Sequence, residues 1–108
     1  MTMRQSLLLL PLAALLPAMP LAAAAPHTHV VVIDKMKFGA VPANLRAGDT
    51  IVWVNRDLFK HTATARKGSY NVDLPPRTKA KTLIRSAGAI PFYCISHPGM
   101  TGVLKVAR

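Results

Sequence analysis

The sequence predicts an all-β sandwich of about seven short strands, preceded by an N-terminal signal peptide. Three observations support this prediction. Beyond residue 27 the apolar residues occur in short β-branched runs or alternate with polar residues, as they do in strands. Glycines and prolines that favour turns separate these runs, and no helical pattern of apolar residues follows the N-terminal segment. Short strands separated by turns are typical of one sandwich domain.

Residues 1–25 carry the three parts of a secretory signal peptide. Arg4 precedes an apolar stretch at residues 7–21, and four alanines follow at 22–25. Three prolines interrupt the apolar stretch, so a membrane-spanning helix is the weaker interpretation. We therefore expect cleavage near the end of the alanine run, export by the general secretion route, and a mature domain formed by residues 26–108.

The first half of this domain contains three predicted strands. Residues 30–33 form a β-branched run, and polar and apolar residues alternate at 35–38. A turn is expected at residues 46–49, where a glycine precedes an aspartate. Residues 50–55, Thr-Ile-Val-Trp-Val-Asn, form the strongest predicted strand, and Trp53 is expected to anchor the core.

The second half contains four further predicted strands. They begin with a short strand at residues 61–65, and a loop with one glycine and two prolines is expected at 66–76. Residues 78–85 alternate polar and apolar side chains, and strands at 90–94 and 102–106 complete the set. A mature chain of about 80 residues can bury only a thin core, so a bound metal ion could add stability.

The mature domain is strongly basic. It contains 13 lysines and arginines, four aspartates and no glutamate, so its net charge is +9. Such a charge favours acidic partners and accelerates encounters with them. A nucleic-acid role is disfavoured, because the chain is predicted to be exported and has no basic segment interleaved with stacking aromatics. The alternatives for this charge are solubility and attraction to an anionic membrane surface, without stable insertion.

Cysteine, histidine and methionine side chains lie close together in the run from Cys94 to Met100, Cys-Ile-Ser-His-Pro-Gly-Met. Thiolate, imidazole and thioether together favour copper over the harder ions that prefer carboxylates and water. A single cysteine cannot form an internal disulfide, and a metal bond would occupy its thiol in an oxidising compartment. A buried, inert cysteine is the alternative. The neighbouring His97 and the methionine favour the metal interpretation.

His61 is the expected fourth ligand. It begins a predicted strand 33 residues before Cys94, and the loop that ends at Met100 would fold over one point at the end of a sandwich. Two imidazoles and one thiolate in a trigonal arrangement, with a weak axial thioether, form a blue (type 1) copper site for electron transfer. The predicted ligands are therefore His61, Cys94, His97 and Met100. Such a site leaves no open coordination position, which argues against catalysis at the metal.

With these residues the chain resembles the cupredoxins. Its short Cys-x-x-His-x-x-Met loop is similar to that of amicyanins, whereas the loops of plastocyanins and azurins are longer. The likeness covers nearly the whole mature chain, from the valine-rich first strand through residues 47–57 to His61 and on to 87–94. It implies a Greek-key β-sandwich of about seven to eight strands. It also implies one type 1 copper ion on the four predicted ligands and outer-sphere electron transfer through the exposed edge of His97.

Three positions near the predicted site differ from the residues that are usual in these families. Thr62 stands where cupredoxins usually have an asparagine that ties the two ligand loops together. Lys60 and Ser96 stand where amicyanins have prolines. Ser96 therefore has a backbone N–H, and we expect this group to reach the Cys94 sulfur and to raise the reduction potential.

The predicted function is that of a periplasmic electron carrier that is not itself an enzyme. We expect a monomer whose redox partners, a c-type cytochrome or a periplasmic dehydrogenase, have acidic docking surfaces. The alternative is a periplasmic copper carrier or metallochaperone. A detached domain of a copper oxidase or reductase is disfavoured, because only His27 and His29 remain as further histidines. These two histidines could bind a second, loosely held copper ion, but a solvated strand start is the favoured interpretation.

Overall fold

The computed structural model describes residues 25–108 and, before them, only residues 3, 11, 15 and 17. The predicted signal peptide therefore lies almost entirely outside the described residues, and it stays a prediction. Within the described residues, no helix is long and apolar enough to cross a membrane.

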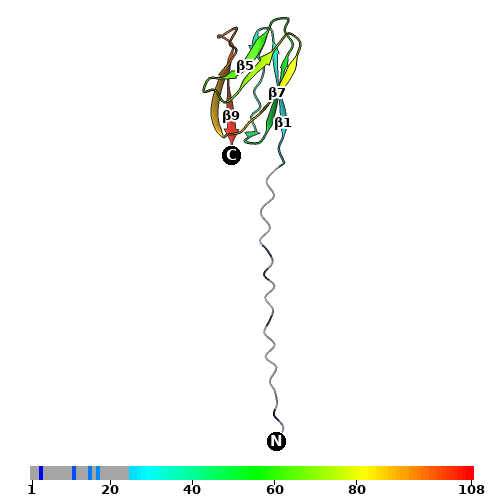
Figure 1. The fold of residues 1–108 in the computed structure, drawn as a ribbon, viewed down its shortest axis with the longest axis vertical. Coiled ribbons are helices and arrows are strands. Elements are labelled where there is room, and N and C mark those ends of the chain that lie inside the picture. Colours follow the sequence, from blue (N-terminus) through cyan, green and yellow to red (C-terminus); the bar gives the residue numbers. More distant parts are fainter. Residues whose placement is uncertain (1–2, 4–10, 12–14, 16, 18–24) are drawn as a thin grey trace.

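Two β-sheets pack face to face and confirm the predicted all-β sandwich (Figure 1). The first sheet contains, in spatial order, β2 (Lys37–Phe38), β1 (Thr28–Asp34), β4 (Thr50–Asn55) and β7 (Lys79–Leu83). The second sheet contains β3 (Leu45–Arg46), β9 (Thr101–Ala107), β8 (Gly88–Tyr93), β5 (His61–Ala65) and β6 (Asn71–Leu74). The β1–β4 and β3–β9 pairs are parallel, and the other pairs are antiparallel. The chain thus crosses between the sheets, as in Greek-key sandwiches.

The described residues form nine strands, and two of these, β2 and β3, contain only two residues each. Residues 66–76, expected to be rich in loop, also contain a strand that the sequence pattern did not predict, β6. β6 pairs with β5 from His61↔Leu74 to Thr64↔Asn71. Its four residues include one β-branched side chain, so β6 depends on the ladder with β5 more than on local propensity. The turn expected at 46–49 contains Gly48 at a φ of 97°, although its first residue pairs with β9.

Alternation along the strands turns one face of each sheet towards a shared core. Trp53 and Phe92 are fully buried there, and their rings pack edge to face with centroids 5.2 Å apart. Trp53 is confirmed as a core anchor, and its Nε1 donates a hydrogen bond of 3.0 Å to Thr82 Oγ1. A Cβ on Gly102 would lie 2.3 Å from Phe92 Cζ, so this position accommodates only glycine beneath the ring.

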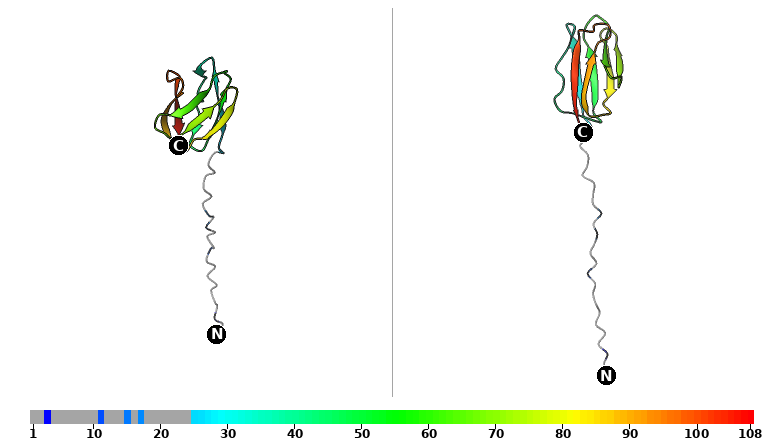
Figure 2. Two further views of the ribbon diagram at one scale, coloured as in Figure 1. Left: turned by 45° about the horizontal axis from the view of Figure 1, so that its top comes forward. Right: turned by 90° about the vertical axis from the view of Figure 1, so that its left-hand side faces the viewer.

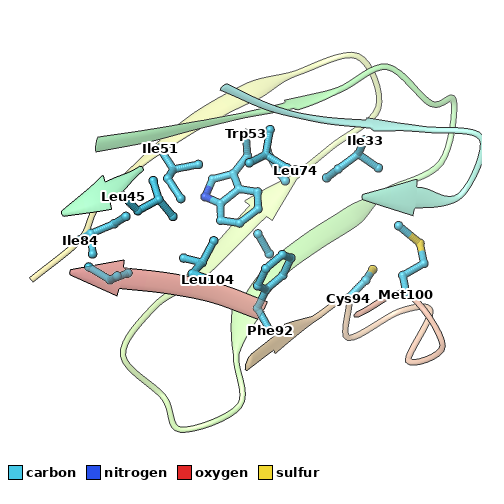
Figure 3. Close-up of a cluster of buried hydrophobic side chains, with 13 residues drawn as sticks. Ile33, Leu45, Ile51, Trp53, Leu74, Ile84, Phe92, Cys94, Met100 and Leu104 are labelled. Atoms are coloured by element: carbon cyan, nitrogen blue, oxygen red, sulfur yellow. The ribbon is translucent and has the colours of Figure 1, made fainter. Parts of the chain in front are cut away.

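The predicted ligands lie at one end of the sandwich. β5 begins at His61, and β8 ends at Tyr93, directly before Cys94. β5 and β8 are antiparallel and pair at Thr64↔Tyr93 and Ala65↔Phe92, so the chain that continues past Tyr93 runs towards the start of β5. Met100 directly precedes β9, so its loop lies at the end opposite the C-terminus, as Figures 1 and 2 show. Figure 3 shows Cys94 and Met100 together at this end of the core.

Candidate metal centre

Three donor atoms from two segments of the chain converge at this end. His61 Nδ1 and His97 Nδ1 each lie 3.7 Å from Cys94 Sγ. The donor atoms of these residues all lie within 4.8 Å of one another, and in the described part of the chain they form the one such group of three. The spacing leaves room for an ion bonded to each donor at about 2.0–2.3 Å. The arrangement therefore fits a metal ion between the three side chains.

Backbone hydrogen bonds hold the loop from Cys94 to Met100 in a tight turn. Cys94 N–H donates to Met100 O at 3.1 Å, and His97 N–H donates to Cys94 O at 3.3 Å. Met100 N–H closes the turn by donating to His97 O at 2.9 Å. Met100 is 7% exposed, and its side chain lies beside that of Cys94 (Figure 3). The structure thus brings all four predicted ligands to one place.

His61 is fully buried, and its second ring nitrogen already has a partner. Its Nε2 lies 2.7 Å from Asp57 Oδ2. An ionised carboxylate can only accept hydrogen bonds, so the proton of the neutral imidazole lies on Nε2. Nδ1 then keeps a free lone pair on the side of Cys94 Sγ. This tautomer is the one that a metal ligand at Nδ1 requires.

Asp57 also holds the β1–β2 turn beside the site. Its carboxylate accepts hydrogen bonds from the N–H groups of Lys35 at 2.8 Å and Met36 at 3.0 Å. Burial acts to raise the pKa of Asp57, but the bonds from Met36, His61 and Lys35 outweigh it and leave the pKa below its usual value. Lys35 and Met36 have φ angles of 51° and 62°, which non-glycine residues rarely adopt. One ionised carboxylate therefore stabilises both a strained turn and the orientation of His61.

The sequence interpretation missed Asp57, because residues 56–60 have only the features of a connection. Asn55 supports the same segment: its Oδ1 accepts a hydrogen bond of 2.9 Å from Asp57 N–H. Its Nδ2 donates to Phe59 O at 2.8 Å and to Leu74 O at 2.9 Å. The signal that could have identified Asp57 is a carboxylate four residues before a candidate ligand histidine.

Thr62 links the two ligand segments. Its N–H donates to Cys94 Sγ at 3.3 Å, and its Oγ1 accepts a hydrogen bond of 2.9 Å from Ile95 N–H. Thr62 thus ties the two ligand segments together with a shorter side chain than the asparagine that is usual in cupredoxins. The expected bond from Ser96 N–H to the Cys94 sulfur is absent from the hydrogen bonds of the described residues. The sulfur faces the β5 backbone instead, where Thr62 lies.

The outer side of the site is apolar. His97 is partly exposed, whereas His61 is fully buried, and their ring centroids lie 5.0 Å apart. Leu58 is 73% exposed, Phe59 60% and Ile95 49%. The ring of Phe59 contacts His97, with centroids 6.5 Å apart. We refer to Leu58, Phe59 and Ile95 as the His97 patch.

His27 and His29 belong to no group of three or more potential metal ligands among the described residues. His29 Nε2 instead lies 2.9 Å from Asp49 Oδ2, and His27 N–H donates to Asp49 Oδ1 at 2.9 Å. Arg46 N–H donates to the same carboxylate at 3.0 Å. These bonds, led by that of the His27 N–H, lower the pKa of Asp49 to about 2. The cluster joins the start of β1 to the turn before β4, which is a structural role.

Comparison with known proteins identifies relatives of this chain, although no protein-family model matches it. The chain is 32% identical over 95 residues to amicyanin of Paracoccus versutus, and the match covers 81% of the chain and 72% of that protein. It is 28% identical to amicyanin of Paracoccus denitrificans with the same coverage.

Solved structures give the same result. The crystal structure of Paracoccus versutus amicyanin matches with a TM-score of 0.63 and 27% identity, over 74% of this chain and 81% of that one. The Cu(I) form of a methionine-to-alanine amicyanin variant matches with a TM-score of 0.62 and 27% identity, over 80% of this chain and 88% of that one. The fold, the ligand cluster and the sequence similarity thus all indicate the same family. The chain therefore belongs to the amicyanin family of cupredoxins and is a blue copper electron carrier, not an enzyme.

Proposed function

We propose that His61, Cys94, His97 and Met100 bind a single copper ion, through which the protein carries single electrons between redox partners. The observation that carries this proposal is the convergence of two histidine Nδ1 atoms on one cysteine sulfur, each at 3.7 Å, from distant segments. Copper bound by these donors supplies a one-electron Cu(I)/Cu(II) couple. The thioether of Met100 would be the weak fourth ligand.

The protein's contribution is to hold the donors in one geometry in both redox states. Asp57 fixes the tautomer and ring orientation of His61 through a contact of 2.7 Å. Thr62 joins the β5 backbone to the cysteine loop. Cys94 is fully buried, so water is kept away from the thiolate. Little rearrangement is then needed when an electron arrives or leaves, and the barrier to transfer is low.

Electrons would enter and leave at the ring of His97, which is the exposed member of the cluster. Phe59 of the His97 patch packs against this ring, and Leu58 and Ile95 are exposed near Phe59 and His97 in the sequence. An exposed apolar patch with a polar surround is typical of a protein docking site. The patch excludes water when a partner docks, and the ring edge then lies close to the partner's redox group.

We infer that these partners have acidic docking surfaces and are a c-type cytochrome or a periplasmic dehydrogenase. All 13 lysines and arginines of residues 26–108 are exposed, and complementary charge speeds the encounter of such a surface with an acidic one. The predicted signal peptide supports a periplasmic location. We propose that the protein acts as a monomer, because its high net charge opposes self-association.

A copper carrier that delivers the ion is the competing function. Its ion would have to be released to a partner, but His61 and Cys94 are both fully buried. The site therefore favours keeping the copper and exchanging the electron.

The decisive experiment adds Cu(II) to the purified protein and records the visible spectrum. An intense blue thiolate-to-copper band is expected, and a Cys94→Ser variant should lack it. A colourless complex would contradict the type 1 assignment. Repeated reduction and reoxidation then separates the two functions: an electron carrier retains its copper, whereas loss of Cu(I) to a chelator in each cycle would indicate a copper carrier.

A further inference from the structure

We propose that the outer face of the β2-β1-β4-β7 sheet docks on an anionic lipid membrane. This inference does not depend on the copper ligands. The face is formed by branched aliphatic side chains from three neighbouring strands, and we name it the valine face: Val30, Val32, Val52, Val54 and Leu83.

Strand register places these side chains in one continuous block. Across the parallel β1–β4 ladder, Val30 pairs with Val52 and Val32 pairs with Val54. Leu83 extends the block onto β7. The side chains that alternate with them in β1 and β4 face the core and are largely buried, so the valines face outwards. Val30 is 53% exposed and Leu83 48%, and the other three are half-buried.

A row of cations borders the valine face along its β7 edge. Lys79 and Lys81 are exposed and pair with the two valines of β4, so they lie on the same side of the sheet. Arg77, with a φ of 61°, lies two residues before β7, and Arg85 lies two residues after it; both are exposed. Alternate residues of a strand lie about 6–7 Å apart, so Lys79 and Lys81 follow one another along the β7 edge of the sheet. Figure 1 shows β1 and β7 on one side of the domain and β9 on the other.

These cations are not neutralised by carboxylates of the described residues. The two ion pairs there join His29 to Asp49 and His61 to Asp57. Two of the four aspartates are therefore used internally. Of the two exposed aspartates, Asp73 lies on β6 in the other sheet, and Asp34 lies at the end of β1 on the side of the valines, where it pairs with Lys37 of β2. A row of free lysines and arginines beside an apolar surface is the composition that binds anionic lipid headgroups at a membrane surface.

A membrane fits this face better than two other occupants. A second copy of residues 26–108 would bring a further net charge of +9 onto it. A protein partner is disfavoured by composition: lysine is depleted in protein interfaces and aromatic residues are enriched, whereas the valine face has lysines at its edge and no aromatic side chain. The His97 patch, with its phenylalanine, has the opposite character. It lies at the end of the strands and the valine face on their side, so both surfaces can act at once.

The test is cosedimentation of the protein, with the same N-terminus in every variant, with lipid vesicles. One set contains about 30% phosphatidylglycerol in phosphatidylcholine, and the other contains phosphatidylcholine alone. Binding to the anionic set is expected, with a marked loss when salt rises from about 0.15 M to about 0.5 M. Replacing both lysines, K79Q with K81Q, should weaken binding roughly 30-fold. Val30→Thr with Val52→Thr should also weaken it, at unchanged charge.

The matched control removes two lysines elsewhere, Lys67→Gln with Lys105→Gln. Lys105 lies on β9 in the other sheet, and Lys67 follows β5. Equal loss of binding in this control and in the K79Q/K81Q variant would overturn the proposal, because binding would then report net charge alone. Failure to bind the anionic vesicles would also overturn it. So would dimers in solution that the Val30→Thr/Val52→Thr variant abolishes, or binding to soluble poly-glutamate that is as tight as binding to vesicles.

Discussion

Two histidine–aspartate pairs lie at opposite ends of β4, and they serve different purposes. Asp49 directly precedes β4 and lies 2.9 Å from His29, and Asp57 follows β4 and lies 2.7 Å from His61. Both carboxylates also accept backbone N–H groups, and both have a pKa below the usual value. Judged by the pair alone, the two ends of the strand are equivalent.

The difference lies on the other side of each imidazole. His61 Nδ1 faces Cys94 Sγ at 3.7 Å, and His97 comes from the same loop as the sulfur. His29 belongs to no such group in the part of the chain that the structure describes. A carboxylate thus orients an imidazole in either setting. A metal centre arises only where a second segment brings a thiolate to the free nitrogen.

The largest difference between the two ends of β4 is expected when their histidines, His61 and His29, are substituted in turn. His61→Gln removes a proposed nitrogen ligand and should abolish the blue band on addition of Cu(II). His29→Gln removes the corresponding ring at the other end and should leave the band unchanged, because no copper donor is lost. Visible spectra of the two variants at equal copper loading provide the measurement. A lost band in the His29→Gln protein would mean that the two ends are coupled.

Replacing each aspartate by asparagine distinguishes the role of Asp57, which orients a ligand histidine, from the structural role of Asp49. Asp57→Asn should weaken copper binding by about 10- to 100-fold, the usual cost of losing a partner that orients a ligand histidine. Asp49→Asn should leave copper affinity unchanged while lowering the urea concentration at the unfolding midpoint. Competition with a copper chelator and urea titration measure the two quantities. Equal copper affinities in the two variants would contradict the positioning role of Asp57.

Acid should lower the stability of the fold by protonating Asp49, which directly precedes β4. Because folding lowers the pKa of Asp49 from 3.8 to about 2, its ionised form stabilises the fold at higher pH. That contribution is complete above the unfolded pKa and is lost as the pH falls through the folded value. The free energy of unfolding of the copper-free protein should therefore drop between about pH 4 and pH 2. Urea titrations at several pH values should show a smaller drop for Asp49→Asn, and an identical drop would contradict this assignment.

The smallest effect concerns the link between the two ligand segments. Thr62→Val removes the acceptor of the 2.9 Å bond from Ile95 N–H and should cost about 1 kcal/mol of stability. It should also shift the reduction potential measurably, because the cysteine loop loses a tie to β5. Thr78→Val removes one exposed hydrogen bond to Pro75 O and is the matched control. An unchanged potential in Thr62→Val would show that the backbone alone holds the loop.

Much of this architecture could be predicted from local pattern. The β-branched run at 50–55 and the apolar, aromatic-containing run at 90–94 are local strand signals, and both regions form strands. β6 could not be predicted in this way, because its hydrogen bonds come from β5. The two-residue strand β3 similarly owes its existence to a parallel pairing with β9.

The candidate site divides along the same line. Cys94, His97 and Met100 lie within one loop, so their side-chain types and spacing can be read directly from the sequence. With His61, they were enough to predict copper and the expected ligand set. Only the tertiary structure decided that Asp57 orients His61 and that Thr62, not Ser96, donates to the Cys94 sulfur. The reason is physical. Metal preference depends on the chemistry of a few side chains, whereas a hydrogen bond depends on a few tenths of an ångström between atoms that the fold brings together from distant segments.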